Sequence, residues 1–337
     1  MKRLILLITF IVVSLLSQSQ NTIKILLIGS SHGRNTIGQF PVLASHSGFN
    51  VICGNAYKGG LRIQSVANMC LTGENFPELY SKFYDGKWHD KNPAQMSILD
   101  MLHDEVWDII SIQRAAAEDR YWNDNQTQSL EIILNYIKDN CSYSPTIVFN
   151  SGFADSYSIE DREKQQKETE DIWNSVQYVK EHYKIDIIPV APIIQSIRNN
   201  DELAGLGSYS KHMLSFDSQH LDLGIGMYAS ACVCYDFFLR QRFGKKVIDC
   251  QYLPTFDDIS YGYVESKFTP IEEKYAKMIR EIVDDYYTEK ETVNITPPMI
   301  IKQRNSRIYS ISGYQKSNPS NGMVIMDGKK VLSRTRH

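Results

Sequence analysis

Residues 23–31 read IKILLIGSS, an almost unbroken aliphatic run that ends in a glycine and two serines. Similar apolar runs follow along the chain at residues 49–53, 107–112, 146–149 and 185–190. Runs of this length with little polar alternation are typical of strands buried on both faces. Longer stretches with helical spacing separate them, most clearly residues 127–138 and 159–182. The alternation predicts an α/β fold with a five-stranded parallel sheet, flavodoxin-like, in a three-layer α/β/α arrangement.

Two further helices are expected in the last third of the chain. Residues 223–243 begin at a glycine-rich turn and become nearly all apolar, which predicts a buried helix. Residues 269–287 start with Pro270 and two glutamates, as helix beginnings often do. We therefore expect the main domain to span residues 20–290.

The chain changes character after Thr292. A Pro297-Pro298 pair marks a break, and short strand patterns follow at residues 307–311, 323–326 and 331–332. These patterns predict a small β tail over residues 291–337. A frayed terminus is the alternative, because chain ends are often poorly ordered.

The N-terminus has the pattern of a secretory signal peptide over residues 1–19. Lys2 and Arg3 precede an apolar stretch at residues 4–16, and Ser17 and Ser19 are small enough for cleavage before Gln20. A retained anchor is the alternative, although the stretch is short for a membrane span. We expect an exported protein, periplasmic, extracellular or at the cell surface, with no membrane span after signal removal.

Composition excludes some partners and cofactors. The 337 residues are 42% hydrophobic and 22% charged with a net charge of -3, which gives no basic footprint for nucleic acid. The six cysteines are sparse for this length, and Cys53, Cys232 and Cys234 fall in segments where buried free thiols are expected. No Cys-x-x-Cys or His-x-x-x-His spacing occurs, so the sequence predicts neither a metal nor a cofactor.

The ends of the predicted strands carry the candidate site. Open α/β sheets bind ligands beyond the carboxyl ends of their strands, near the point where the strand order reverses. At those ends the sequence places a hydroxyl, flexible glycines and amide side chains, namely Gly29 to Gly33, Asn55 to Gly60, Gln113 with Arg114, and Asn150 with Ser151. We expect these groups to meet at one edge of the sheet.

A second segment, residues 216–220 with the sequence FDSQH, supplies an acid and a base three residues apart. A serine hydroxyl is a weak nucleophile until a neighbouring base takes its proton. We therefore predict Ser31 as nucleophile, His220 as base and Asp217 as the carboxylate that orients it. An oxyanion needs preorganised donors, and the candidates are the backbone N–H groups of Ser31 and Gly60 and the side-chain amide of Gln113.

Each of these residues also has a structural interpretation. Ser30 and Ser31 could only cap the helix that follows them. Asp222 is a weaker rival for the orienting carboxylate, and His32 is the only other plausible base beside Ser31. Because adjacent side chains usually diverge, we assign His32 to a substrate-contact role, together with Gly59, Arg114 and Asn150.

In these residues the chain resembles the SGNH (GDSL-like) hydrolase superfamily, most closely a bacterial branch whose first block reads Gly-Asn-Ser-Phe. That block corresponds here to residues 29–32, and Asn55 with Gly60 corresponds to the second block. Residues 107–113 resemble the third block, with Gln113 in place of asparagine, and residues 217–220 the fourth. Residues 187–198 resemble its late strand, so the resemblance spans about residues 23–287. His32 in place of phenylalanine and residues 114–116 in place of a polar run are departures.

The resemblance implies metal-independent ester hydrolysis, often the deacetylation of carbohydrates, with a small-molecule or glycan ester as partner. Aromatic residues near the strand exits are candidates for stacking on sugars: Tyr57, Trp88, Tyr121 and Trp122. The tail resembles a C-terminal β module that in some exported proteins is a sorting or attachment signal, which implies export machinery as a partner. The rival functions are a glycan-binding or surface-display protein without turnover and a metal-dependent phosphoesterase, and the latter lacks the clustered carboxylates and histidines it needs.

Overall fold

The computed structural model describes residues 21–91, 96–210, 212–259 and 262–292 together with four short strands at 308–310, 315–316, 322–326 and 329–333. The predicted signal peptide lies outside these residues. Within them, no helix is both long enough and apolar enough to cross a membrane.

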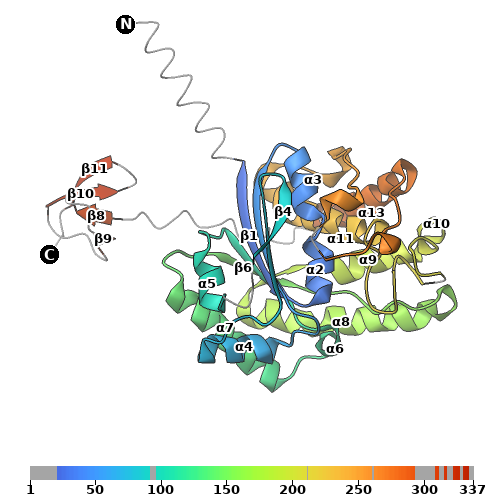
Figure 1. The fold of residues 1–337 in the computed structure, drawn as a ribbon, viewed down its shortest axis with the longest axis horizontal. Coiled ribbons are helices and arrows are strands. Elements are labelled where there is room, and N and C mark those ends of the chain that lie inside the picture. Colours follow the sequence, from blue (N-terminus) through green and yellow to red (C-terminus); the bar gives the residue numbers. More distant parts are fainter. Residues whose placement is uncertain are drawn as a thin grey trace, which may run out of the picture.

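A seven-stranded sheet with the order β4-β3-β2-β1-β5-β6-β7 forms the centre of the main domain (Figure 1). Its parallel strands are β1 (Thr22–Gly29), β2 (Asn50–Tyr57), β5 (Ile109–Ile112), β6 (Thr146–Asn150) and β7 (Asp186–Ile188). These are the strands expected from the apolar runs. Because β1 lies between β2 and β5, the strand order reverses beside β1, as in flavodoxin-like sheets. The predicted fold class is confirmed.

The expected number of strands was wrong, because an antiparallel hairpin extends the sheet beyond β2. The hairpin consists of β3 (Leu79–Tyr84) and β4 (Lys87–Lys91). Asp85 and Gly86 connect the strands, both with positive φ (52° and 78°), the conformation that tight hairpin turns require. The Asp-Gly pair was the sequence signal for this hairpin.

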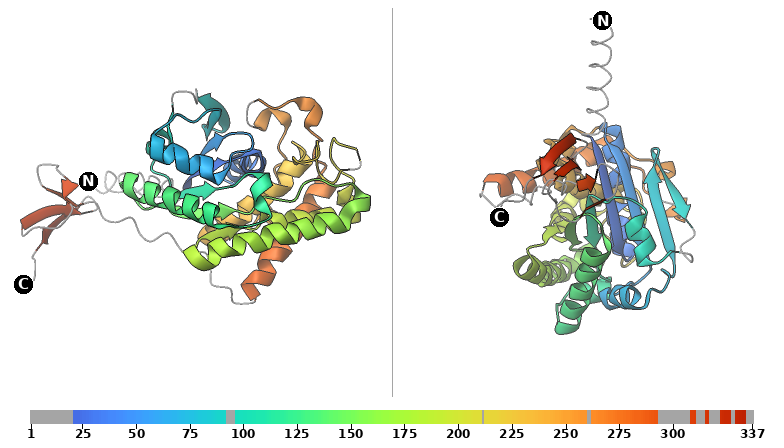
Figure 2. Two further views of the ribbon diagram at one scale, coloured as in Figure 1. Left: turned by 90° about the horizontal axis from the view of Figure 1, so that it is seen from below. Right: turned by 90° about the vertical axis from the view of Figure 1, so that its left-hand side faces the viewer.

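The two faces of the sheet are covered by separate helical layers (Figures 1 and 2). One layer packs on Ile23, Ile25 and Leu27 of β1 and contains α2 (Ser31–Ile37), α3 (Phe40–His46), α9 (Val190–Asn199), α11 (Ile225–Tyr235) and α13 (Glu273–Thr292). The other packs on Leu26 and Ile28 and contains α4 (Ile63–Thr72), α5 (Ile98–His103), α7 (Asp124–Asn140) and α8 (Arg162–Tyr183). Since successive side chains of a strand point to opposite faces, one aliphatic run supplies both cores.

The nearly all-apolar segment at residues 223–243, which was expected to form a buried helix, contains α11 at the centre of its layer. Every residue of α11 is buried, and the helix continues through a π-helical turn (Asp236–Arg240) into α12 (Gln241–Phe243). The patterns at residues 127–138, 159–182 and 269–287 likewise correspond to α7, α8 and α13. All six cysteines are buried and free, which confirms the expectation for Cys53, Cys232 and Cys234.

The tail contains a separate four-stranded antiparallel sheet with the order β11-β10-β8-β9. Its strands are β8 (Ile308–Ser310), β9 (Gln315–Lys316), β10 (Gly322–Met326) and β11 (Lys329–Ser333). Strand patterns were expected at three of these places, and their role in sorting or attachment stays a prediction.

Gly54 offers a test of how tightly β2 packs. A Cβ at this position would lie 2.7 Å from the Tyr80 hydroxyl and 2.9 Å from the Trp107 ring, both fully buried. We expect Gly54→Ala to lower the free energy of unfolding by about 1–3 kcal/mol, because the Tyr80 hydroxyl must leave Asp104, which accepts its hydrogen bond at 2.9 Å. Urea unfolding followed by circular dichroism measures the change.

Gly205 is the matched control, since it has φ -79° and ψ -4° and open space around the added Cβ. Gly205→Ala should leave stability unchanged or raise it by up to about 1 kcal/mol. Equal effects of the two substitutions would contradict the packing argument.

Candidate active site

The two neighbouring serines in the turn between β1 and α2 have different surroundings. Ser30 is the residue before α2, and its buried hydroxyl donates to Gln113 Oε1 at 2.8 Å instead of capping the helix. Ser31 is the first residue of α2 and is half-buried at the edge of the sheet. The Ser30 hydroxyl is thus engaged by Gln113, and the nucleophile role of Ser31 stays a prediction.

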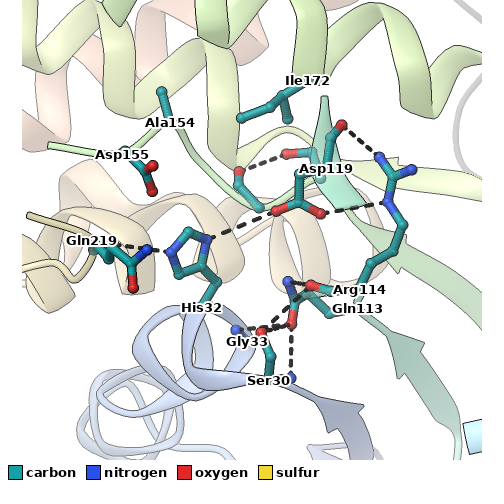
Figure 3. Close-up of polar contacts among 12 residues, drawn as sticks. Ser30, His32, Gly33, Gln113, Arg114, Asp119, Ala154, Asp155, Ile172 and Gln219 are labelled. Carbon is teal, nitrogen blue, oxygen red and sulfur yellow. Dashed lines mark hydrogen bonds and ion pairs between the residues drawn. The ribbon is translucent and has the colours of Figure 1, made fainter. Parts of the chain in front are cut away.

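The Gln113 side chain braces this turn from the end of β5 (Figure 3). Its Oε1 accepts from the backbone N–H of Ser30 at 2.8 Å and of Gly33 at 3.3 Å, in addition to the Ser30 hydroxyl. Its Nε2 donates to the Arg114 carbonyl. Gly29 and Gly33 lie so close that a Cβ on either would come within 3.1–3.2 Å of Gln113. Gln113 therefore stands beside Ser31 as expected, and its oxyanion role stays a prediction.

The loop after β2 reaches the same edge. The Lys58 N–H donates to the Gly29 carbonyl at 3.3 Å, which ties this loop to the end of β1. Gly60 is exposed with φ +61°, a conformation that favours glycine. The N–H of its neighbour Gly59 donates to the Glu78 carboxylate, so that donor is already occupied.

Asp217 and His220 contact each other directly, and their roles as acid and base stay a prediction. His220 Nδ1 lies 2.8 Å from Asp217 Oδ2, while Asp217 Oδ1 accepts from the backbone N–H groups of Gln219 and His220 at 2.8 and 2.7 Å. The His220 ring stacks on Phe216 with 5.3 Å between ring centroids. This leaves Nε2, the atom that a base in a serine triad uses, on the opposite side of the ring from Asp217.

Burial and hydrogen bonding set the protonation states of this pair. Burial lowers the pKa of His220 below its ordinary value, and the Asp217 carboxylate only partly opposes this. Burial alone would raise the pKa of Asp217, but the hydrogen bonds from Gln219 and His220 hold it below its ordinary value. At neutral pH the pair is therefore a neutral imidazole beside a carboxylate, the state that accepts a proton.

His32 shows that the two candidate segments meet. Its ring lies 6.0 Å from the His220 ring in an edge-to-face arrangement, and its Nε2 lies 2.9 Å from the Gln219 carbonyl oxygen (Figure 3). Since His32 directly follows Ser31, the first turn of α2 and the Asp217–His220 loop share one edge of the sheet. Residues nearly 190 positions apart in sequence are thus brought together.

Three residues assigned to substrate contact lie behind this edge. His32 is buried and stacks on Phe153 with 4.0 Å between ring centroids. Asn150 is buried, and its Oδ1 accepts from the Gly152 N–H at 2.9 Å. Arg114 is fully buried and donates to the carbonyls of Asp119 and Tyr121, both at 2.7 Å. These side chains form the support of the site rather than its exposed surface.

The alternative carboxylate, Asp222, is fully buried and accepts from Ser208, Gly224 and Thr269. It holds the loop before α11 and does not orient His220. Among the aromatic candidates, Trp122 stacks on Tyr178 and packs on Phe149, whereas Tyr121 is 50% exposed.

Asp119 is the residue that the sequence analysis missed. It ends the short helix α6 (Ala116–Asp119), is fully buried, and has Oδ2 3.8 Å from His32 Nδ1. Gly152 has φ +72°, and a Cβ there would lie 2.5 Å from Asp119 Oδ2. An alanine-rich helical turn gives no sign of such a contact, so sequence alone offered no signal for it.

Comparison with known proteins places the chain in a family. Residues 24–261 match the family described as "Domain of unknown function (DUF4886)". A DUF4886 family protein from Bacteroides uniformis ATCC 8492 has a solved structure that is 23% identical, with a TM-score of 0.64 over 83% of this chain and 100% of its own. This similarity supports the fold. No curated protein matches the sequence.

Two other solved structures are more distant. A proposed SGNH hydrolase from Slackia heliotrinireducens is 15% identical, with a TM-score of 0.41 over 64% of this chain and 98% of its own. An acetyl xylan esterase is 11% identical, with a TM-score of 0.43 over 64% of this chain and 100% of its own.

The geometry of the pair predicts how His220 titrates. We expect its NMR midpoint to lie below 6.5, because burial outweighs the carboxylate, and to fall further in Asp217→Asn, because the interactions that raise the pKa are then lost. A pH titration of the ring signals measures both midpoints, with His220→Gln to assign the resonance. A wild-type midpoint above 6.5, or a rise in Asp217→Asn, would contradict the geometry.

Proposed function

The chain belongs to the DUF4886 family, and from the geometry at the sheet edge we propose that it is an exported serine esterase that removes O-acetyl groups from carbohydrate. The observation that carries the proposal is the His220–Asp217 pair, with His220 Nε2 turned away from the carboxylate, beside the turn that presents Ser31. A hydroxyl, an imidazole and a carboxylate in this relation are the parts of a serine hydrolase triad.

The proposed reaction has two steps. Ser31 Oγ attacks the ester carbonyl carbon while its proton passes to His220 Nε2, and collapse of the intermediate breaks the carbon–oxygen bond to the sugar. The imidazolium gives its proton to the departing alkoxide, which leaves as an alcohol. Water then attacks the acyl-enzyme with His220 again as base, and acetic acid and free Ser31 result.

The oxyanion of each intermediate needs donors that are already in place. We assign the backbone N–H groups of Ser31 and Gly60 and the second hydrogen of the Gln113 amide nitrogen, whose first hydrogen is directed to the Arg114 carbonyl. Loss of one such donor typically costs on the order of 100-fold in rate. The carbohydrate part of the proposal rests on the resemblance to SGNH hydrolases, and exposed Tyr121 is a candidate for stacking on a sugar ring.

The test of the nucleophile uses two adjacent serines. We expect Ser31→Ala to lower kcat for p-nitrophenyl acetate at least about 1000-fold, because the attacking oxygen is removed. Ser30→Ala is the matched control. It removes a hydroxyl that donates to Gln113 Oε1 at 2.8 Å and lies 3.4 Å from the Arg114 carbonyl oxygen. The net value of such a bond is about 1 kcal/mol, so kcat should stay within about 10-fold of wild type. Acetate release from an acetylated oligosaccharide measures the same variants on a carbohydrate ester.

Equal activity in wild type and Ser31→Ala would remove the proposed nucleophile. Inactivity of the wild type on every ester, combined with retention on a glycan column, would instead favour the binding protein without turnover. Loss of activity on adding a chelator would favour the metal-dependent alternative.

Export has its own test. Expressed in a bacterial host with its first 20 residues intact, the protein should be recovered outside the cytoplasm with Gln20 as its first residue, because the apolar stretch is followed by small residues suited to cleavage. Intact-mass analysis of the recovered protein measures this. A protein that keeps Met1 and stays in the cytoplasm would contradict export.

A further inference from the structure

The imidazole of His32 is fixed on every side although no step of the proposed reaction uses it. Its ring is 1% exposed and stacks nearly parallel on Phe153. Nε2 lies 2.9 Å from the Gln219 carbonyl oxygen, and Nδ1 faces Asp119 Oδ2 at 3.8 Å (Figure 3). A side chain held this way connects the helix that begins at Ser31 to the loop that carries His220.

Asp119 is a buried carboxylate whose partners are charges. Within the described residues, neither of its oxygens has a hydrogen-bond partner. Oδ2 faces His32, and Oδ1 lies 3.4 Å from Arg114 Nε. A buried carboxylate without hydrogen bonds is costly unless opposite charges or a raised pKa compensate it.

The protons of His32 follow from its partners. A carbonyl oxygen only accepts hydrogen bonds, so Nε2 must carry a hydrogen directed at Gln219. On the other side of the ring, Nδ1 faces Asp119 Oδ2 at 3.8 Å. The Gln219 carbonyl therefore decides which nitrogen donates, while Phe153 and Asp119 hold the ring in place.

We propose that His32 and Asp119 are positioning residues for the esterase reaction: the carboxylate fixes the imidazole, and the imidazole fixes the Gln219 carbonyl and with it the loop that presents His220. This inference rests on the proposed function. A second hydrogen bond to the same loop comes from the Ser156 N–H, which donates to the Ser218 carbonyl at 2.8 Å. Consecutive carbonyls of the loop are therefore held from two sides.

Burial and neighbouring charges determine the direction in which the pKa values of Asp119 and His220 are shifted. Burial raises the pKa of Asp119 above its ordinary value, and His32 and Arg114 oppose this only in part. Burial lowers the pKa of His220, and His32 is among the neighbours that lower it further. The titratable and charged groups that face this cluster come from several elements and are Asp119, Asp155, His220, Arg114, Asp217 and Lys267.

The test separates the effect of the His32 hydrogen bond to Gln219 from the effect of the His32 ring packed on Phe153. His32→Phe keeps an aromatic ring against Phe153 and loses the donor to Gln219, and we expect kcat to fall on the order of 10- to 100-fold with KM within about threefold of wild type. His32→Gln places an amide donor near the lost Nε2 and should recover part of kcat. Asp119→Asn should also lower kcat, because the negative charge that faces His32 Nδ1 and Arg114 Nε is lost.

A second measurement needs no turnover. The NMR midpoint of His220 should rise in His32→Phe, because His32 is among the groups that lower the pKa of His220. Asp236→Asn is the matched control, since Asp236 is equally buried and paired with Arg240 at 2.8 Å on another part of the fold. It should lower the melting temperature without changing kcat or the midpoint.

The two proposals fail in different ways. If the wild type hydrolyses no ester, the esterase proposal fails, and the His220 midpoint in His32→Phe still decides whether His32 acts on His220. If the wild type is active but folded His32→Phe keeps wild-type kcat and midpoint and folded Asp119→Asn keeps wild-type kcat, the positioning role is overturned. Loss of kcat in His32→Phe with no recovery in His32→Gln would also overturn it.

Discussion

One buried amide oxygen, Gln113 Oε1, sets where the candidate nucleophile lies. It accepts three hydrogen bonds, two from Ser30 and one from Gly33. These bonds join the end of β5 to the turn between β1 and α2. Because β1 and β5 are both central strands of the sheet, the turn that they anchor is held rigidly. Gly29 and Gly33, which flank the turn, leave room for the Gln113 amide. The half-buried position of Ser31, the first residue of α2, follows from this arrangement.

The base is placed by a different kind of support. The loop that carries His220 has no regular secondary structure, so its backbone groups depend on neighbours for their partners. Ser156 holds the Ser218 carbonyl from the loop after β6, and His32 holds the Gln219 carbonyl from α2. The nucleophile is therefore fixed by the sheet, while the base is fixed by two segments that pack on the sheet edge. A displacement of the loop after β6 would therefore be transmitted through the Ser156–Ser218 hydrogen bond to the loop that carries His220.

Sequence patterns were sufficient to predict the regular strands and the short-range Asp217–His220 spacing. Aliphatic runs in β1 predicted the sheet, and the Asp217–His220 spacing predicted a pair that the structure closes to 2.8 Å. The hairpin was missed because β3 and β4 mix polar and aromatic residues, although their Asp-Gly turn was readable. Asp119 and the buried state of Arg114 were not readable at all. Their positions depend on how α6 folds over the sheet edge, which no local pattern in the sequence encodes.

Fully buried arginines support the irregular backbone at the edge of the sheet. Buried ion pairs seldom stabilise a protein relative to apolar packing, so their presence needs another reason. Here two fully buried arginines hold irregular backbone at the sheet edge: Arg114 donates to the carbonyls of Asp119 and Tyr121, and Arg198 to those of Ala154 and Met213. A guanidinium offers five donors in a fixed plane, so one side chain can satisfy several carbonyls that no helix or strand would reach. Apolar residues of the same size would fill the space but leave those carbonyls unpaired. The burial of charge is therefore the physical requirement for building a rigid edge out of loops.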